Sequence, residues 1–215
     1  MPDWKSQARQ DEAVYRILRG RPGTFFDVGS HDPIRINNTV CLEQQGWTGY
    51  LFDCDPQWAE PTARFRTSPF LCVDVSTFDW RGFLTAKGIT RVDYLSFDVD
   101  EASLATLRRF PFDQVSFQVC TIEHDRYRFG EAVATEMRDI LSRHGYTLLC
   151  KDVCNQGNPY EDWYVAPALA PAAPLPLCSG LEWTECLKTL RTHYPDPSSA
   201  SPESGASLSQ CLNTE

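Results

Sequence analysis

The sequence lacks the features of a membrane protein and of a general nucleic-acid-binding protein. No run approaches the roughly 18 consecutive apolar residues that a membrane-spanning helix requires. Basic residues are outnumbered, 20 against 29 acidic residues, which gives a formal net charge of −9. This balance argues against sequence-independent binding to nucleic acid or to an anionic membrane. We therefore expect neither a nucleic acid nor a membrane as a partner.

The N-terminal stretch also lacks the apolar core of a secretory signal peptide, and acidic residues occur early in it. Without such a signal, nine cysteines, an odd number, do not predict a disulfide framework. Cys150 and Cys154 lie four apart, but no second Cys or His pair at zinc spacing is near them. We expect a cytoplasmic location, no zinc site, and buried thiols at Cys54, Cys72 and Cys120, which fall in or beside apolar runs.

What the sequence does contain is an alternation of short apolar runs and stretches of helical spacing. Strands are predicted at 23–29, 49–56, 69–76, 91–100, 112–125, 146–153 and 162–167. Helices are predicted at 3–20, 36–46, 57–66, 77–88, 101–110 and 129–145. Strands separated by helices of this length are typical of an α/β fold with a parallel sheet. The last two strands, joined directly, predict a closing antiparallel pair.

This alternation ends after residue 167. The next stretch is rich in Ala and Pro and is typical of an extended linker, followed by one more predicted helix. The last residues have the Ser-rich composition of a disordered tail. We therefore divide the chain into an N-terminal helix (1–21), an α/β domain (22–167), a linker with a helix (168–194) and a tail (195–215).

Acidic side chains follow five of the predicted strands, at Asp27, Asp53, Asp74, Asp98 and Glu123. In open α/β sheets, ligands bind outside the carboxyl ends of the strands. A rim of carboxylates there suits a cationic ligand, and no G-x-x-x-x-G-K-[ST] loop is present to hold a triphosphate.

Two cationic cofactors fit this rim, a nicotinamide dinucleotide and S-adenosylmethionine. Asp53 stands where an acidic residue binds ribose hydroxyls in dinucleotide folds. The loop after the first strand contains one glycine, Gly29, whereas close approach of a pyrophosphate needs G-x-G-x-x-G. S-adenosylmethionine has no phosphates, so the single glycine favours it over the nicotinamide cofactor of an oxidoreductase.

Four stretches, taken in order, resemble the FkbM-type S-adenosylmethionine-dependent methyltransferases. They are FFDVGSHDPIRINNTVCLEQQGWTGYLFDCDP (25–56), VDYLSFDVDEASLATLRRF (92–110), VCTIEHDRYR (119–128) and LSRHGYTLLCKDVCNQGNPYEDWYV (141–165). The resemblance implies a Rossmann-like seven-stranded methyltransferase fold, with a mostly parallel sheet and an antiparallel closing strand pair. It also implies an S-adenosylmethionine-dependent O-methyltransferase that acts on a hydroxyl of a small molecule, a sugar or a secondary metabolite.

The resemblance further implies the residues that bind the cofactor. Residues of the first loop contact its amino-acid end, a polar pair begins the adjoining helix, and acids at the next two strand ends contact the ribose and the adenine. These residues are, in order, Asp27, Gly29 and Ser30, then Asn38 with Thr39, then Asp53 and Asp74.

By the same resemblance, Asp98, Glu123 and His124 face the transferred methyl group and the acceptor. Methyl transfer is an in-line displacement, so the protein mainly positions the acceptor and excludes water. A hydroxyl acceptor must also lose its proton, and His124 is the natural general base because its pKa lies near working pH. The competing mechanism places a divalent cation such as Mg²⁺ among Asp98, Glu123 and Asp125. We favour the histidine mechanism and assign no metal ligand.

The sequence departs from the family pattern at several of these motifs. Pro33 stands where the first motif ends in glycine, and in an active enzyme we expect it to start the following helix. Glu101 replaces a glycine, Ser103 an acidic residue and Asp125 an asparagine. Glu101 would place a side chain where the backbone needs a positive φ or a close approach. The alternative function is therefore a catalytically inactive methyltransferase-fold protein that acts in binding or scaffolding.

Overall fold

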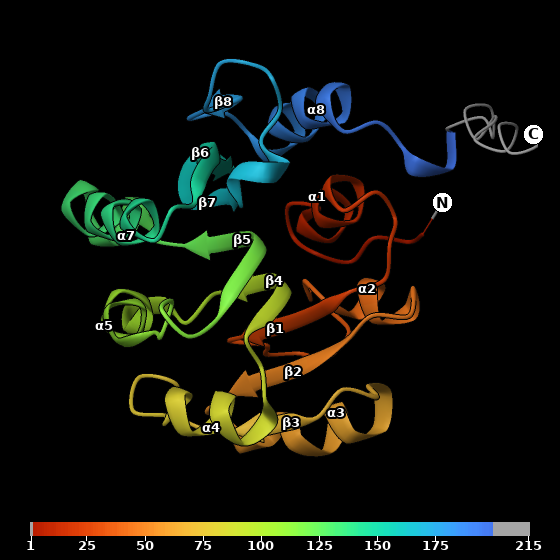
Figure 1. The fold of residues 1–215 in the computed structure, drawn as a ribbon, viewed down its shortest axis with the longest axis vertical. Coiled ribbons are helices and arrows are strands. Elements are labelled where there is room, and N and C mark those ends of the chain that lie inside the picture. The colour runs from red at the N-terminus through yellow and green to blue at the C-terminus, as the bar shows by residue number, and fades with distance from the viewer. Residues whose placement is uncertain (1, 200–215) are drawn as a thin grey trace, which may run out of the picture.

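The computed structural model describes residues 2–199, and they form one mixed sheet with helices on both faces (Figure 1). The sheet order is β3-β2-β1-β4-β5-β7-β6-β8. The strands are β1 (Thr24–Val28), β2 (Thr48–Asp53), β3 (Phe70–Cys72), β4 (Arg91–Phe97), β5 (Ser116–Glu123), β6 (Thr147–Asn155), β7 (Asn158–Val165) and β8 (Cys178–Ser179).

Strands β3, β2, β1, β4 and β5 are parallel, and β7 is antiparallel to both β5 and β6. The predicted Rossmann-like α/β fold, mostly parallel with an antiparallel closing pair, is therefore confirmed. The eighth strand, β8, pairs parallel to β6 within the segment that the sequence predicts as a linker. Two residues are too few to show the alternation by which a strand is recognised.

Helices cover both faces of the sheet. In Figure 1, α4, α5 and α7 lie on one side, and α1, α2 and α8 on the other. The helices are α1 (Gln10–Ile17), α2 (Val40–Gln44), α3 (Ala59–Phe65), α4 (Trp80–Lys87), α5 (Ser103–Arg109), α6 (Arg126–Phe129), α7 (Glu131–Arg143) and α8 (Trp183–His193).

The helix predicted at 36–46 is wrong at its start, because α2 begins only at Val40. The side chain of Asn37 accepts hydrogen bonds from the backbone N–H groups of Thr39 (3.0 Å) and Val40 (2.9 Å). An Asn that satisfies the free N–H groups of a first turn ends the preceding loop. Pro33 therefore lies in that loop and not in the first turn of the helix.

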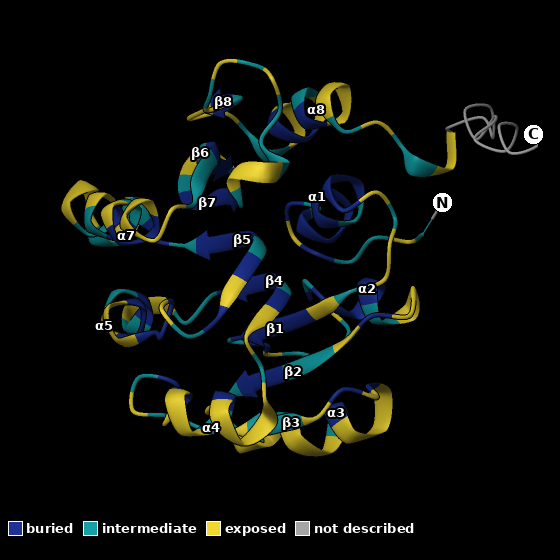
Figure 2. Cartoon of the chain, viewed as in Figure 1, coloured by how far each residue is buried: buried dark blue, intermediate teal, exposed yellow. Residues whose placement is uncertain are grey.

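Each face of the sheet has its own hydrophobic core, because successive strand residues point to opposite sides. Phe25 packs on the face that carries α1 and α8, and Phe26 packs on the face that carries α4 and α7. Figure 2 shows the central strands buried along most of their length. In α7, the buried residues include Met137, Ile140 and Leu141.

Two expectations about single residues differ from the structure. Cys120 is buried as expected. Cys54 and Cys72 are instead exposed, because they lie where β2 and β3 end, at the carboxyl ends of these strands. In the predicted tail, residues 200–215 lie outside the described residues. Within the described part of the chain, no helix is both long enough and apolar enough to span a membrane.

Candidate active site

The loops that follow β1, β2, β3 and β4 enclose a first cavity of about 370 Å³. Its wall includes Gly29, Asp53, Asp74, Asp98 and Glu101. All four loops leave the carboxyl ends of parallel strands, which is where ligands bind in folds of this type. The acidic strand ends recognised in the sequence therefore converge on one cavity.

Gly29 lies at the closest approach between the ends of β1 and β4. Its φ is +86°, and a Cβ atom built on it would lie 1.5 Å from the carbonyl oxygen of Asp98. Gly29 N–H and Ser30 N–H both donate to the carbonyl of Phe52, at 2.9 and 3.0 Å. The single glycine of this loop is thus required by backbone packing as well as by its positive φ.

Asp53 is held in the wall of the first cavity by two backbone donors. His31 N–H donates to Asp53 Oδ2 (2.8 Å), and Asp55 N–H donates to Oδ1 (2.9 Å). The His31 ring lies against the Trp58 indole, with centroids 4.4 Å apart. Each carboxylate oxygen keeps a free lone pair, so Asp53 can still accept hydrogen bonds from a ligand.

Asp74 lines the first cavity from the end of β3 and is exposed. Its Oδ1 accepts hydrogen bonds from the hydroxyl (2.6 Å) and the backbone N–H (2.9 Å) of Ser76. These two bonds lower the pKa of Asp74.

Three of the predicted cofactor residues have other positions. Within residues 2–199, Asp27, Ser30 and Asn38 do not line the first cavity. Asp27 is buried, which raises its pKa, and accepts a hydrogen bond from Thr39 Oγ1 (2.6 Å). Asn38 Nδ2 donates to Ser96 Oγ (3.0 Å). The Ser30 hydroxyl is buried with no hydrogen-bond partner among the described residues.

Arg66, which no motif in the sequence marks, fixes the loop between β1 and α2. The buried guanidinium of Arg66 donates to the carbonyl of Pro33 (3.3 Å), to Asn37 Oδ1 (3.1 Å) and to Thr39 Oγ1 (2.9 Å). Pro33 is thereby held against Arg66, as part of the loop's support. No local pattern marks Arg66, because its partners lie about 30 positions earlier in the chain.

A second cavity, of about 340 Å³, lies beside the first and shares Asp98 and Asp100 with it. Residues of β5, α6, the N-terminal segment and the β6–β7 hairpin complete its wall. These are Gln7, Glu123, Asp125, Tyr127, Arg128, Asn155, Gln156, Asn158 and Tyr160.

Asp98 and Glu123 are a pair of interacting carboxyl groups at the boundary between the two cavities. Burial, together with the negative charges of nearby aspartates, raises the pKa of Asp98. Burial and the neighbouring charge of Asp98 raise the pKa of Glu123 further. The negative charge of each carboxylate disfavours ionisation of the other, so the pair holds protons more strongly than isolated carboxyl groups do.

Arg128 joins the two loops at the rim of the second cavity. Its Nη1 donates to Asp100 Oδ1 and to Asp125 Oδ2, each at 2.7 Å. Asp100 and Asp125 both have positive φ values, 48° and 43°, so backbone strain lies at Asp100 and not at Glu101 as expected. Oxygens of Asp100, Glu123 and Asp125 lie close enough to bind a cation, but Arg128 already supplies positive charge there.

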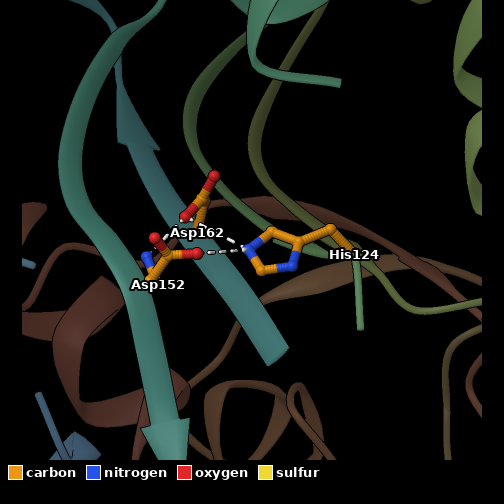
Figure 3. A group of neighbouring side chains, drawn as sticks. All are labelled: His124, Asp152 and Asp162. Atoms are coloured by element: carbon orange, nitrogen blue, oxygen red, sulfur yellow. Dashed lines mark hydrogen bonds and ion pairs between the residues drawn. The ribbon is translucent and has the colours of Figure 1, made fainter. Parts of the chain in front are cut away.

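His124 has a different environment from the one expected. Its buried ring points toward Asp162 and Asp152, with Nε2 at 3.2 and 3.7 Å from an Oδ1 atom of each (Figure 3). Its Nδ1 accepts a hydrogen bond from Arg126 N–H (3.1 Å). Successive residues at a strand end point to opposite faces. Glu123 therefore lines the second cavity, and His124 points away from it.

Arg138 of α7 completes the cluster around His124. It donates to Asp162 (2.7 Å) and to Asp152 (2.6 Å), and Arg126 donates to Asp152 (2.6 Å). Burial alone would raise the pKa of Asp162, but contacts with His124 and Arg138 lower it to about 2. These side chains are of types that can bind a metal ion. The positive charges of the two arginines, however, already balance the negative charges of the two carboxylates.

Glu161, which the sequence analysis did not single out, lies behind the wall of the second cavity. Its Oε1 accepts hydrogen bonds, each 2.8 Å long, from Tyr160 OH, Trp163 Nε1 and Gln10 Nε2. Burial raises the pKa of Glu161 to about 8. It pairs with Glu123 across β5 and β7, so both side chains are on the same face.

A family model and a solved structure that resemble this chain are those of methyltransferases. A family model described as Methyltransferase FkbM domain matches residues 28–148. No curated protein matches the chain. The structure of human methyltransferase-like protein 13, in complex with SAH, is similar with a TM-score of 0.57 at 14% sequence identity, over 94% of this chain and 97% of that chain.

Two bacterial structures are also similar. An rRNA methylase from Streptococcus thermophilus has a TM-score of 0.49 at 12% identity, over 73% of this chain and 93% of that one. The O-methyltransferase TomG from Streptomyces achromogenes, in complex with SAM, has a TM-score of 0.49 at 12% identity, over 77% and 83%. The human structure supports the methyltransferase fold, and the family model matches more than half of the chain. The protein therefore belongs to the FkbM family of methyltransferases.

Proposed function

We propose that the protein is an S-adenosylmethionine-dependent O-methyltransferase acting on a hydroxyl group of a small molecule, a sugar or a secondary metabolite. The observation that carries this proposal is the pair of neighbouring cavities that share Asp98 and Asp100. The first cavity would take the cofactor, and the second would take the acceptor. Asp98 and Asp100 would then lie at the boundary where the methyl donor meets the acceptor.

The residues around the first cavity fit S-adenosylmethionine. Asp53 is oriented to accept hydrogen bonds from ribose hydroxyls, and Asp74 adds a second carboxylate. Beside Gly29, the Ser30 N–H donates to the Phe52 carbonyl (3.0 Å), so Ser30 would support the loop at the amino-acid end of the cofactor. Asp27 and Asn38 would support this end through Thr39 and Ser96. When bound, S-adenosylmethionine supplies an electrophilic methyl group on a positively charged sulfur.

Asp98 and Glu123 are the catalytic residues of this proposal. The acceptor hydroxyl must release one proton as its oxygen forms the new bond to carbon. The coupled carboxyl pair faces the second cavity and can accept that proton on Asp98 while Glu123 keeps its own. That His124 is the general base stays a prediction. Its ring nitrogens contact Asp162 and Arg126, which supports a role in positioning the end of β5.

A small neutral or cationic acceptor fits the charge of the site better than a nucleic acid. Four carboxyl groups line the second cavity, at Asp98, Asp100, Glu123 and Asp125. Such a wall repels the phosphates that a nucleic acid would bring to it.

Calorimetric titration with S-adenosylmethionine and S-adenosylhomocysteine tests the proposal. Both ligands are expected to bind the wild-type protein. Asp53→Ala should weaken binding by about 1.5–3 kcal/mol, because charge-assisted hydrogen bonds to the ribose are lost. Asp113→Ala, which removes an exposed ion pair with Arg81, is the matched control and should leave binding unchanged. Absence of binding to the wild type would contradict the proposal.

A further inference from the structure

The wall of the second cavity has a chemical character that narrows the class of acceptor. This inference rests on the proposed function, because it assigns the second cavity to the acceptor. Among the described residues that line it, four carry carboxyl groups and one, Arg128, carries a positive charge. The single guanidinium of Arg128 is bound on both sides, by Asp100 and by Asp125. No positive charge in this wall is therefore free to bind an anionic acceptor.

The remaining groups of the wall are neutral hydrogen-bonding side chains. Gln7, Asn155, Gln156 and Asn158 provide amides, each with both donors and an acceptor. Tyr127 adds an exposed aromatic ring at the rim. Amides of this kind match the hydroxyl groups of a polyol, and a Tyr ring next to carboxylates attracts a cation through its face.

The amide side of the wall is built by segments outside the residues that the family model matches. Gln7 precedes the match, and the hairpin of Asn155 to Tyr160 follows it. Gln156 and Gly157 both have positive φ values at the hairpin tip, and their N–H groups donate to the carboxylate of Glu182. This part of the wall is thus held in place by Glu182, which also lies outside the matched residues.

We propose that the second cavity binds an amine-bearing polyol, such as an amino sugar or an aminocyclitol. Its ammonium group would contact the carboxylates of Asp98 and Asp100, and its hydroxyl groups would contact the amides of the hairpin and of Gln7. Neutral sugars would lack the charge interaction, and phosphorylated sugars would be repelled.

The test is a titration of the protein loaded with S-adenosylhomocysteine, carried out below the pKa of the probe amine. The amine probes are D-glucosamine and 2-deoxystreptamine. The comparison probes are D-glucose, N-acetyl-D-glucosamine and D-glucosamine 6-phosphate. We expect the amine probes to bind about tenfold more tightly than the comparison probes, which corresponds to one ion-pair contribution.

Equal binding of D-glucose, tighter binding of the phosphorylated sugar, or absence of amine binding to a protein that does bind S-adenosylhomocysteine would each overturn the inference. Absence of S-adenosylhomocysteine binding would instead contradict the proposed function. These two failures are therefore distinguishable in one experiment.

Two lysine substitutions test whether the amine probes bind in the second cavity. Asn158 is exposed and lines only the second of the two cavities, so Asn158→Lys adds a positive charge there without filling the first. It should weaken amine binding about tenfold and leave S-adenosylhomocysteine affinity unchanged. Gln44→Lys, at an exposed position of α2, is the control and should change neither. Unchanged amine binding in Asn158→Lys would overturn the inference.

Discussion

The two cavities of this protein are built in different ways. The first is formed by the loops that follow four parallel strands, at Gly29 and His31 and at residues 52–54, 73–75 and 98–102. The second combines residues far apart in the chain, from Gln7 to Tyr160. All of the first cavity lies within the family match, whereas much of the second lies outside it. The wall of the proposed cofactor site is therefore part of the matched family domain, whereas the wall of the proposed acceptor site also depends on segments outside that domain.

The largest expected effect is a loss of stability when Gly29, in the wall of the first cavity, is substituted. Gly29→Ala places a Cβ atom against the Asp98 carbonyl and should reduce the free energy of unfolding by more than ~3 kcal/mol. Gly88→Ala is the control, because Gly88 also has a positive φ (+65°) but no atom within 4 Å of its added Cβ. It should cost about 1 kcal/mol. Urea unfolding measures both, and equal losses would contradict the close approach of β1 and β4.

The second-largest expected effect is on the pH dependence of stability, and it comes from Glu161, the carboxyl group behind the second cavity. Burial raises the pKa of Glu161 from its ordinary value of 4.5 to about 8 in the folded protein. The folded protein therefore binds more protons than the unfolded chain between these values, and stability falls as pH rises from 4.5 to 8. This loss is at most ~1.4 kcal/mol per pH unit for one group.

Glu161→Gln keeps the size of the side chain and removes this titration. Thermal unfolding across this pH range should therefore be less pH-dependent in the variant than in the wild type. Asp74→Asn, in the wall of the first cavity, is the control and should leave that pH dependence unchanged, because the pKa of Asp74 is lowered by Ser76. Parallel stability profiles for wild type and Glu161→Gln would show that Glu161 is ionised in the folded state.

The smallest expected effect is at the hairpin of the second cavity. Glu182→Ala removes the carboxylate that accepts the N–H groups of Gln156 and Gly157. Both groups are exposed, so global stability should change by less than about 1 kcal/mol. Hydrogen exchange of these two amides should become about tenfold faster, as followed by NMR, with no change in S-adenosylhomocysteine affinity. Unchanged exchange would mean that Glu182 does not hold the hairpin.

The same contrast explains which features could be predicted from the sequence. The alternation of strands and helices, and the acids that end the strands, depend on local periodicity, so the fold and the wall of the first cavity could be recognised. Gly29, Asp53 and Asp74 lie where the motif implies a ligand. Their roles as cofactor-binding residues stay predictions until a ligand is bound.

Features set by contacts distant in the chain could not be predicted. Arg66 and Glu161 have no local signature, because their partners come from other elements. The start of α2 depends on a cap by Asn37 that competes with helical continuation of the preceding residues. The direction of His124 depends on the phase of alternation at the last residue of β5, and one position changes the face to which a side chain points.

The most direct test of the account is a crystal structure of the protein with S-adenosylhomocysteine. We expect the ligand to occupy the first cavity, with its ribose hydroxyls bonded to Asp53 and its sulfur directed toward Asp98. The second cavity should stay open beside it. Binding of the ligand in the second cavity, or elsewhere on the protein, would contradict it.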